Sequence, residues 1–127
     1  MGKGQAAIDI NASADAVWAV IGDFGGIGDW MPGIESCRVE GDDRILEMLG
    51  MTITERLVAK DDADRVLTYA ITDGVPVESH QGVITVTAEG DVAHVTWNVE
   101  ATPDEMADLM TSVYQQALDA LKTHVEG

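Results

Sequence analysis

The C-terminal segment constrains the fold most, because it predicts one long amphipathic helix that cannot bury its apolar face alone. Pro103, Asp104 and Glu105 mark its start, where acidic side chains favour the positive end of the helix dipole. Apolar residues then recur at intervals of three and four over roughly 20 residues. They are Met106, Leu109, Met110, Val113, Tyr114, Ala117, Leu118, Leu121 and Val125. A strongly curved antiparallel sheet provides a layer that can wrap such a face.

The sequence before this helix predicts that sheet. Ala6 to Ile10 alternates as a first strand, and further alternating segments run from Glu35 to about Asn98. Polar turn signals separate them at a spacing typical of an antiparallel meander. These signals are Gly41-Asp42-Asp43, Gly50, Asp61-Asp62-Ala63-Asp64, Asp73-Gly74 and Glu89-Gly90-Asp91. We expect six to seven strands.

The segment between the first and second strands predicts two short helices. Ser13 is a good N-cap for an apolar helix that ends near Ile21. Several glycines and then Pro32-Gly33 break this helix. Trp30 and Met31 therefore lie on a constrained turn at one end of the sheet. The expected architecture is α+β, a helix-grip arrangement in one domain over residues 1–127.

Composition excludes several classes of function. The 127 residues carry 7 Lys and Arg against 23 Asp and Glu, a formal charge of −16, which repels nucleic acid and anionic membranes. Cys37 is the one cysteine, so no intramolecular disulfide forms. No apolar run has the length of a membrane span. We expect a cytoplasmic monomer or weak homodimer without stable membrane insertion.

Metal and cofactor motifs are absent from the sequence. His80, His94 and His124 are scattered and lack metal-ligand spacing. The glycines fit neither a dinucleotide fingerprint nor a phosphate-binding loop. We therefore expect no metal and no cofactor.

Several short segments, taken with the order of elements, resemble the START/Bet v 1-like (SRPBCC) superfamily. These are Ala16-Val17-Trp18, Asp23-Phe24-Gly25-Gly26, Trp30-Met31-Pro32-Gly33, Thr54-Glu55-Arg56-Leu57 and Tyr69-Ala70-Ile71. The chain is most similar to bacterial polyketide cyclase/dehydrase and lipid-transport proteins. The resemblance implies an internal cavity between the sheet and the last helix. Superfamily members include cyclases, lipid carriers, hormone receptors and co-chaperones, so fold alone does not give the activity.

Strand alternation predicts which polar side chains face this cavity. Glu55 shares its inward face with Ile53 and Leu57, and it is either a rim residue or a carboxylate inside the pocket. Tyr69 and Ile71 share an inward face on the following strand. His80, Gly82 and Ile84 do so on the next, where His80 is either a bystander or a ligand contact. Glu55, His80 and Tyr69 would suit acid–base catalysis or hydrogen bonding to a ligand.

Other candidate ligand-binding residues come from the turn, the sheet and the long helix. They are Trp30, Met31, Trp97, Met106, Met110, Val113 and Tyr114, and each is also consistent with ordinary core packing. The hormone-receptor branch uses a lysine just before a Ser-Cys pair to hold a ligand carboxylate. Glu35 occupies the similar position here, so the resemblance implies that an acidic ligand is not bound in that way.

Three functions follow from these observations. The first is binding of a small, largely apolar ligand, either polyketide-like, aromatic or lipid/isoprenoid, in the internal cavity. The second is a polyketide cyclase or dehydratase that uses Glu55 and His80 as acid and base, with Tyr69 as donor. The third is a protein-interaction module like the co-chaperones, although no long exposed apolar run supports it.

Overall fold

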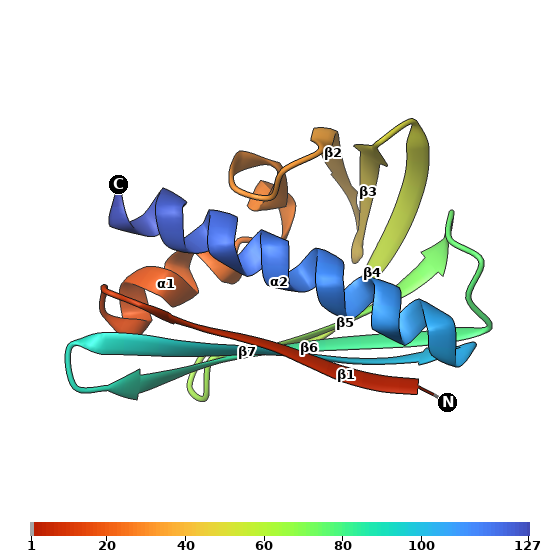
Figure 1. Cartoon of the computed structure of the whole chain (residues 1–127). Helices are drawn as coiled ribbons and strands as arrows, with labels where there is room; N and C mark the ends of the chain where they lie inside the picture. The colour runs from red at the N-terminus through yellow and green to blue at the C-terminus, as the bar shows by residue number, and fades with distance from the viewer. Residues whose placement is uncertain (1) are drawn as a thin grey trace.

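A computed structural model describes residues 2–127 and shows a curved sheet that wraps one long helix (Figure 1). The elements are β1 (Gly2–Ile10), α1 (Ala14–Ile21), the 3-10 helix η1 (Phe24–Asp29), β2 (Ile34–Glu40), β3 (Asp43–Met48), β4 (Met51–Asp61), β5 (Val66–Asp73), β6 (Ser79–Glu89), β7 (Val92–Thr102) and α2 (Asp104–Glu126). The predicted α+β helix-grip fold is confirmed, with seven strands and two short helices between β1 and β2.

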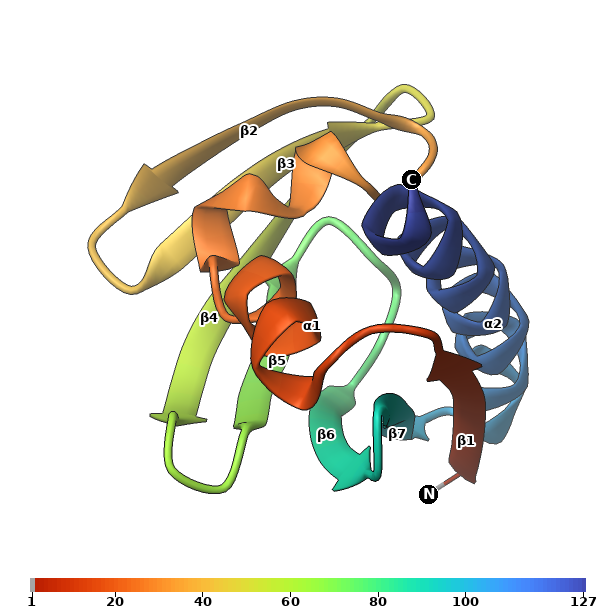
Figure 2. The same ribbon diagram turned by 90° about the vertical axis from the view of Figure 1, so that its left-hand side faces the viewer.

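The sheet has the strand order β1-β7-β6-β5-β4-β3-β2, and every neighbouring pair is antiparallel. Seen along α2, it curls from β1 round to β2, while α1 lies at one open end (Figure 2). Glycine allows β1 and α2 to approach closely. A Cβ atom at Gly4 would lie 1.9 Å from the Thr111 hydroxyl oxygen.

The strand ends at β1 and β7 differ from the prediction. The structure begins the first strand at Gly2, not Ala6, and ends the last at Thr102, not Asn98. These two strands pair along their whole length, from Gly2 with Ala101 to Ile10 with Ala93. Ladder hydrogen bonds therefore hold a glycine- and lysine-containing segment that has little strand propensity of its own.

Strand β4 departs from simple alternation. Its pairing with β5 shifts between Thr54 and Glu55 and again between Leu57 and Ala59. A shift of this kind turns the following side chains away from the face they would otherwise share. Ile53 and Glu55 are buried as predicted, whereas Leu57 is half-buried and Ala59 is exposed. Leu57 still packs against the core, but it borders a separate surface hollow and does not line the cavity.

Local capping follows the prediction. The Ser13 hydroxyl accepts a hydrogen bond from the Ala16 N–H at 3.1 Å and so caps α1. Buried Val17 and Ile21 of α1 join the core beside the C-terminal half of α2. Within residues 2–127, neither helix combines the length and hydropathy that a membrane span requires.

Candidate functional site

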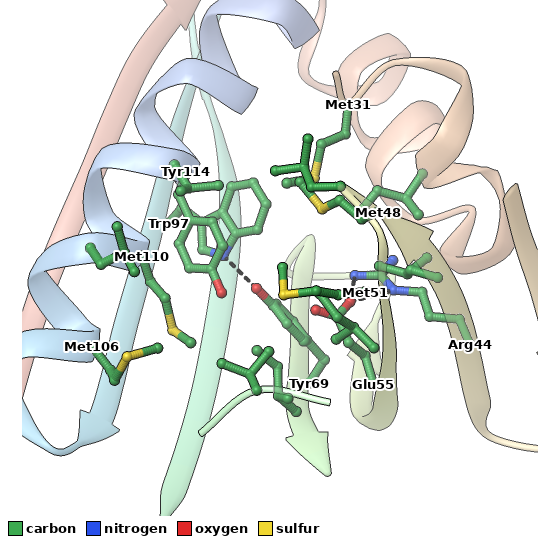
Figure 3. Close-up of a pocket in the computed structure, with 18 residues that line it drawn as sticks. Met31, Arg44, Met48, Met51, Glu55, Tyr69, Trp97, Met106, Met110 and Tyr114 are labelled. Carbon is green, nitrogen blue, oxygen red and sulfur yellow. Dashed lines mark hydrogen bonds and ion pairs between the residues drawn. The ribbon is translucent and has the colours of Figure 1, made fainter. Parts of the chain in front are cut away.

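A cavity of about 260 Å³ lies between the N-terminal half of α2 and the concave face of the sheet (Figure 3). Its wall is almost entirely apolar. The lining residues are Ile27, Met31, Arg44, Leu46, Met48, Leu49, Met51, Ile53, Glu55, Tyr69, Ile71, Val75, Trp97, Met106, Leu109, Met110, Val113 and Tyr114. An apolar space with a few convergent polar groups is the usual form of a small-molecule site.

One polar group of the wall is a buried ion pair. The Arg44 side chain is 2% exposed, and its Nε and Nη2 atoms lie 2.8 Å and 2.7 Å from Glu55 Oε1. Its Nη1 atom donates to the Phe24 carbonyl at 2.9 Å, and its guanidinium lies 4.0 Å from the centroid of the Phe24 ring. These contacts compensate the desolvation of both charges. The carboxylate of Glu55, which sequence analysis identified as a candidate, therefore has a cationic partner.

The second polar feature is a network of four aromatic side chains from β5, β6, β7 and α2. Trp97 Nε1 donates to the Tyr69 hydroxyl at 3.1 Å, and the Trp97 ring stacks on Tyr114 at a centroid distance of 4.1 Å. His80 Nδ1 accepts the Ile71 N–H at 3.0 Å, and His80 Nε2 lies 3.1 Å from the Tyr114 hydroxyl. The two tyrosine hydroxyls point toward each other at the cavity (Figure 3).

Burial sets the protonation of these groups. Desolvation lowers the pKa of His80 to about 4, so its ring is neutral at pH 7. Desolvation also raises the pKa of Tyr69 and of Tyr114 well above the ordinary value for a phenol. The cavity therefore presents neutral hydrogen-bonding groups beside the Arg44–Glu55 pair.

Gly82 makes room for Tyr69. The two residues face each other across β5 and β6, and a Cβ atom at Gly82 would lie 2.5 Å from the Tyr69 ring. Sequence analysis placed Gly82 on the inward face of its strand with His80, where the missing side chain leaves space. The structure fills that space with the phenol ring, which packs between β6 and the cavity.

The rim of the cavity carries exposed apolar side chains. Leu49 at the β3–β4 turn is 71% exposed, Met51 is 44% exposed and Leu109 of α2 is 57% exposed. Leu49 also has a φ of 52°, a left-handed conformation that is uncommon for a residue other than glycine. The rim thus places apolar surface in water directly beside the apolar space.

The structure brings most of the predicted ligand-binding residues to the cavity wall. They are Met31, Ile53, Glu55, Tyr69, Ile71, Trp97, Met106, Met110, Val113 and Tyr114. His80, Gly82 and Ile84 support the wall from behind, since none of them lines the cavity.

Three other predicted residues lie away from the wall. Glu35 is exposed on β2. Leu57 faces a separate surface hollow beside Trp18, because of the irregular pairing of β4. Trp30 is buried against Trp97 at a centroid distance of 6.4 Å, and its Nε1 is a buried donor without an acceptor among the described residues. The turn therefore presents Met31 to the cavity and uses Trp30 as an anchor.

Sequence analysis missed Arg44 and most of the residues of the β3–β4 hairpin that line the cavity. The alternation of Arg44, Leu46 and Met48 places all three on one strand face, and this signal identifies them. A buried arginine is rare unless it is paired. The charge of Arg44 therefore predicts an exposed position unless its partner Glu55 is taken into account.

A further group of metal-ligating side chains occurs on the surface. The ligand atoms of Asp9, Glu89 and His94 lie within 4.8 Å of one another, and His94 Nδ1 is 2.6 Å from Asp9 Oδ1. None of the three lines the cavity.

Comparisons with known proteins agree with this architecture. The profile of the family described as "Polyketide cyclase / dehydrase and lipid transport" matches residues 1–126. No curated protein matches the chain in sequence. The protein XoxI from Bacillus cereus has a solved structure that is 32% identical, with a TM-score of 0.92; the alignment covers 98% of this chain and 96% of the other.

Two more distant structures share the fold. A START superfamily protein from Mycobacterium smegmatis is 15% identical with a TM-score of 0.84, and the alignment covers 99% of this chain and 98% of the other. The di-domain ARO/CYC protein BexL from the BE-7585A biosynthetic pathway is 20% identical with a TM-score of 0.85, over 99% of this chain and 47% of its own length. The chain therefore belongs to the polyketide cyclase/dehydrase and lipid transport family, and it shares its fold with a START superfamily protein.

Proposed function

We propose that the protein binds a small, largely apolar molecule in the cavity beneath α2. The observation that carries this proposal is a half-open cavity of about 260 Å³ whose wall is apolar except for paired polar groups. A cavity of about 150 Å³ holds benzene, so this one suits a molecule of roughly two fused rings or a short isoprenoid chain. Aromatic polyketide-like and lipid or isoprenoid ligands are the finer classes that fit.

The charges of the cavity and of the whole chain favour a neutral or cationic ligand. Glu55 already neutralises Arg44, which is the one cation among the residues that line the cavity. His80 is neutral at pH 7. The chain also carries a formal charge of −16, so an anionic ligand meets repulsion on approach and finds no free counter-charge inside.

The test is a titration with N-phenyl-1-naphthylamine, an uncharged dye whose fluorescence rises in apolar surroundings. We expect saturable binding to one site. Met110→Trp fills the cavity and weakens binding by at least about tenfold, because the space for the dye is lost. Ser112→Trp is the matched control, since Ser112 is exposed on the same helix and away from the cavity.

Two results would contradict the proposal. The first is dye binding that the Met110→Trp and Ser112→Trp variants leave equally unchanged, which would place the dye elsewhere. The second is no saturable binding at all. Circular dichroism of both variants confirms that the fold is intact before either result is interpreted.

The second candidate is an acid–base enzyme of the cyclase or dehydratase type. Glu55 favours it, because this carboxylate lines the cavity and both Arg44 contacts are to its Oε1 atom. In this candidate Glu55 removes a proton from the carbon beside a bound carbonyl, Tyr69 donates to the carbonyl oxygen, and His80 acts through Tyr114. The same geometry serves a carrier, which needs no proton transfer.

Deuterium exchange distinguishes the two candidates without a known substrate. The methyl protons of 2-acetylnaphthalene are followed by NMR in deuterated buffer. An enzyme accelerates their exchange, and Glu55→Gln stops it while leaving affinity for the ketone within about tenfold. Glu40→Gln, on the exposed part of β2, is the control. No acceleration by the unmodified protein would count against the enzyme.

Three other sequence-based expectations stay predictions. They are a single domain over residues 1–127, a cytoplasmic location and a monomer or weak homodimer. The co-chaperone-like interaction module also stays a prediction.

A further inference from the structure

One hydrogen of the aromatic network has no acceptor within the network. Four donors meet at two oxygens: the Trp97 indole N–H, the His80 ring N–H and the hydroxyls of Tyr69 and Tyr114. Tryptophan has a donor only, whereas each hydroxyl has one hydrogen and two acceptor lone pairs. These rules fix the position of each hydrogen in the network.

The His80 tautomer is fixed by the backbone. The Ile71 N–H donates to His80 Nδ1 at 3.0 Å, so Nδ1 carries no hydrogen. The ring is neutral at pH 7, and its one hydrogen must be on Nε2. Nε2 lies 3.1 Å from the Tyr114 hydroxyl and therefore donates to that oxygen.

Only one hydrogen can lie between the two hydroxyl oxygens. Trp97 donates to the Tyr69 oxygen, and His80 donates to the Tyr114 oxygen. One hydroxyl then donates to the other, in either direction. The hydrogen of the second hydroxyl has no acceptor among the residues that the structure describes, and both tyrosines line the cavity.

A buried donor without an acceptor destabilises the protein unless a bound molecule accepts its hydrogen bond. We infer that the hydroxyl pair of Tyr69 and Tyr114 binds the carbonyl oxygen of an uncharged apolar ligand, a ketone, aldehyde, ester or quinone. The inference rests on the proposed ligand binding and adds the position and class of one polar group. A carboxylate is disfavoured at this position, because Glu55 also lines the cavity and Arg44 is already paired with it.

The count makes an unusual prediction for single variants. In Tyr69→Phe, His80 still donates to Tyr114 and the Tyr114 hydrogen is free for the ligand. In Tyr114→Phe, Trp97 still donates to Tyr69 and the Tyr69 hydrogen is free. Either tyrosine alone therefore keeps the preference for a carbonyl, and only Tyr69→Phe/Tyr114→Phe loses it.

The experiment compares 2-acetylnaphthalene with 2-isopropylnaphthalene, which has the same shape but carries no oxygen. Binding of each is measured by competition with N-phenyl-1-naphthylamine. We expect the ketone to bind about threefold to tenfold more tightly to the unmodified protein and to each single variant. In the double variant the two affinities become equal, while that of the hydrocarbon stays the same.

Infrared spectroscopy provides a readout that does not depend on comparing affinities. The carbonyl stretch of carbon-13-labelled 2-acetylnaphthalene falls in frequency when the oxygen accepts a hydrogen bond. We expect a lower frequency in the protein than in hexane, and a return toward the hexane value in the double variant.

The outcomes separate this inference from the proposal on which it rests. If neither naphthalene nor the dye binds, the proposed function is wrong. If both naphthalenes bind equally and the carbonyl frequency matches that in hexane, the cavity binds apolar molecules but the hydroxyl pair does not select a carbonyl. Loss of the preference in one single variant alone would also overturn the assignment.

Discussion

The two halves of α2 carry the same apolar spacing but meet different surroundings. In the C-terminal half, Ala117, Leu118 and Leu121 are at most 1% exposed and pack within the core near α1. In the N-terminal half, Met106 and Met110 face the cavity (Figure 3). The first half contributes packing, whereas the second half forms the wall of a space.

This contrast shows what hydrophobic periodicity reports. A repeat of three and four identifies the face of a helix that turns away from water, and it does not say whether atoms or a ligand space lie opposite. Flexible Met106 and Met110 line the space, whereas Ala117, Leu118 and Leu121 fill the core. The comparison can be tested at both ends.

The largest loss of stability is expected at the cavity end, from Arg44→Met. This change leaves the buried Glu55 carboxylate without its cation, at a cost of about 3–5 kcal/mol. Urea unfolding measures the free energy of unfolding. Arg44→Met/Glu55→Leu removes both charges and should recover most of the loss. If the double variant were as unstable as the single one, the loss would come from packing against Phe24 and Tyr69.

Replacement of single α2 side chains by alanine compares the two halves of the helix directly. Leu118→Ala creates a void in packed surroundings and should cost about 2–5 kcal/mol. Met110→Ala enlarges a space that already exists, so we expect a loss of about 1 kcal/mol. Thermal unfolding of both variants measures the difference. Equal losses would mean that the N-terminal half is packed as tightly as the C-terminal half in solution.

His80 predicts a dependence of stability on pH. Its pKa is 6.5 in the unfolded chain and about 4 in the folded one, so the unfolded state binds the proton first as pH falls. The stability contribution is complete above pH 6.5 and is lost between pH 6.5 and about 4, up to about 3 kcal/mol. His80→Asn, whose carbonyl can accept the Ile71 N–H, should lack this part of the dependence in urea unfolding. Identical pH profiles would contradict the assignment.

Gly82→Ala tests the cavity wall from the side of the sheet. The added Cβ overlaps the Tyr69 ring and must push it toward the cavity, which should cost about 1–3 kcal/mol and weaken dye binding. Gly28→Ala is the control, because its Cβ would lie 3.4 Å from the nearest atom, an ordinary contact. Similar losses in both variants would show a general effect of glycine replacement.

Sequence patterns predicted most of the architecture because the elements here are locally consistent. Turn signals, the Ser13 cap and the long α2 repeat all indicate the same fold. The ends of β1 and β7 were predicted less well, since they depend on pairing between residues far apart in sequence. The position of Leu57 depends on the irregular pairing of β4 with β5, which no sequence pattern predicted.

The candidate site was predicted in its composition but not in its connections. Alternation placed Glu55 and Tyr69 on one concave surface, and both line the cavity. Their partners follow only from three-dimensional structure: Arg44 neutralises Glu55, and Trp97 donates to Tyr69. His80 was predicted to face the cavity, yet it lies behind Tyr114 with both ring nitrogens engaged.

The exposed rim of the cavity has a consequence for how such a protein diverges. Leu49, Met51 and Leu109 contribute little to the core, so replacing them costs the fold little free energy. The same three side chains also line the cavity. Substitutions at this rim can therefore alter which ligand the cavity accepts, while the packed end of α2 keeps the fold stable.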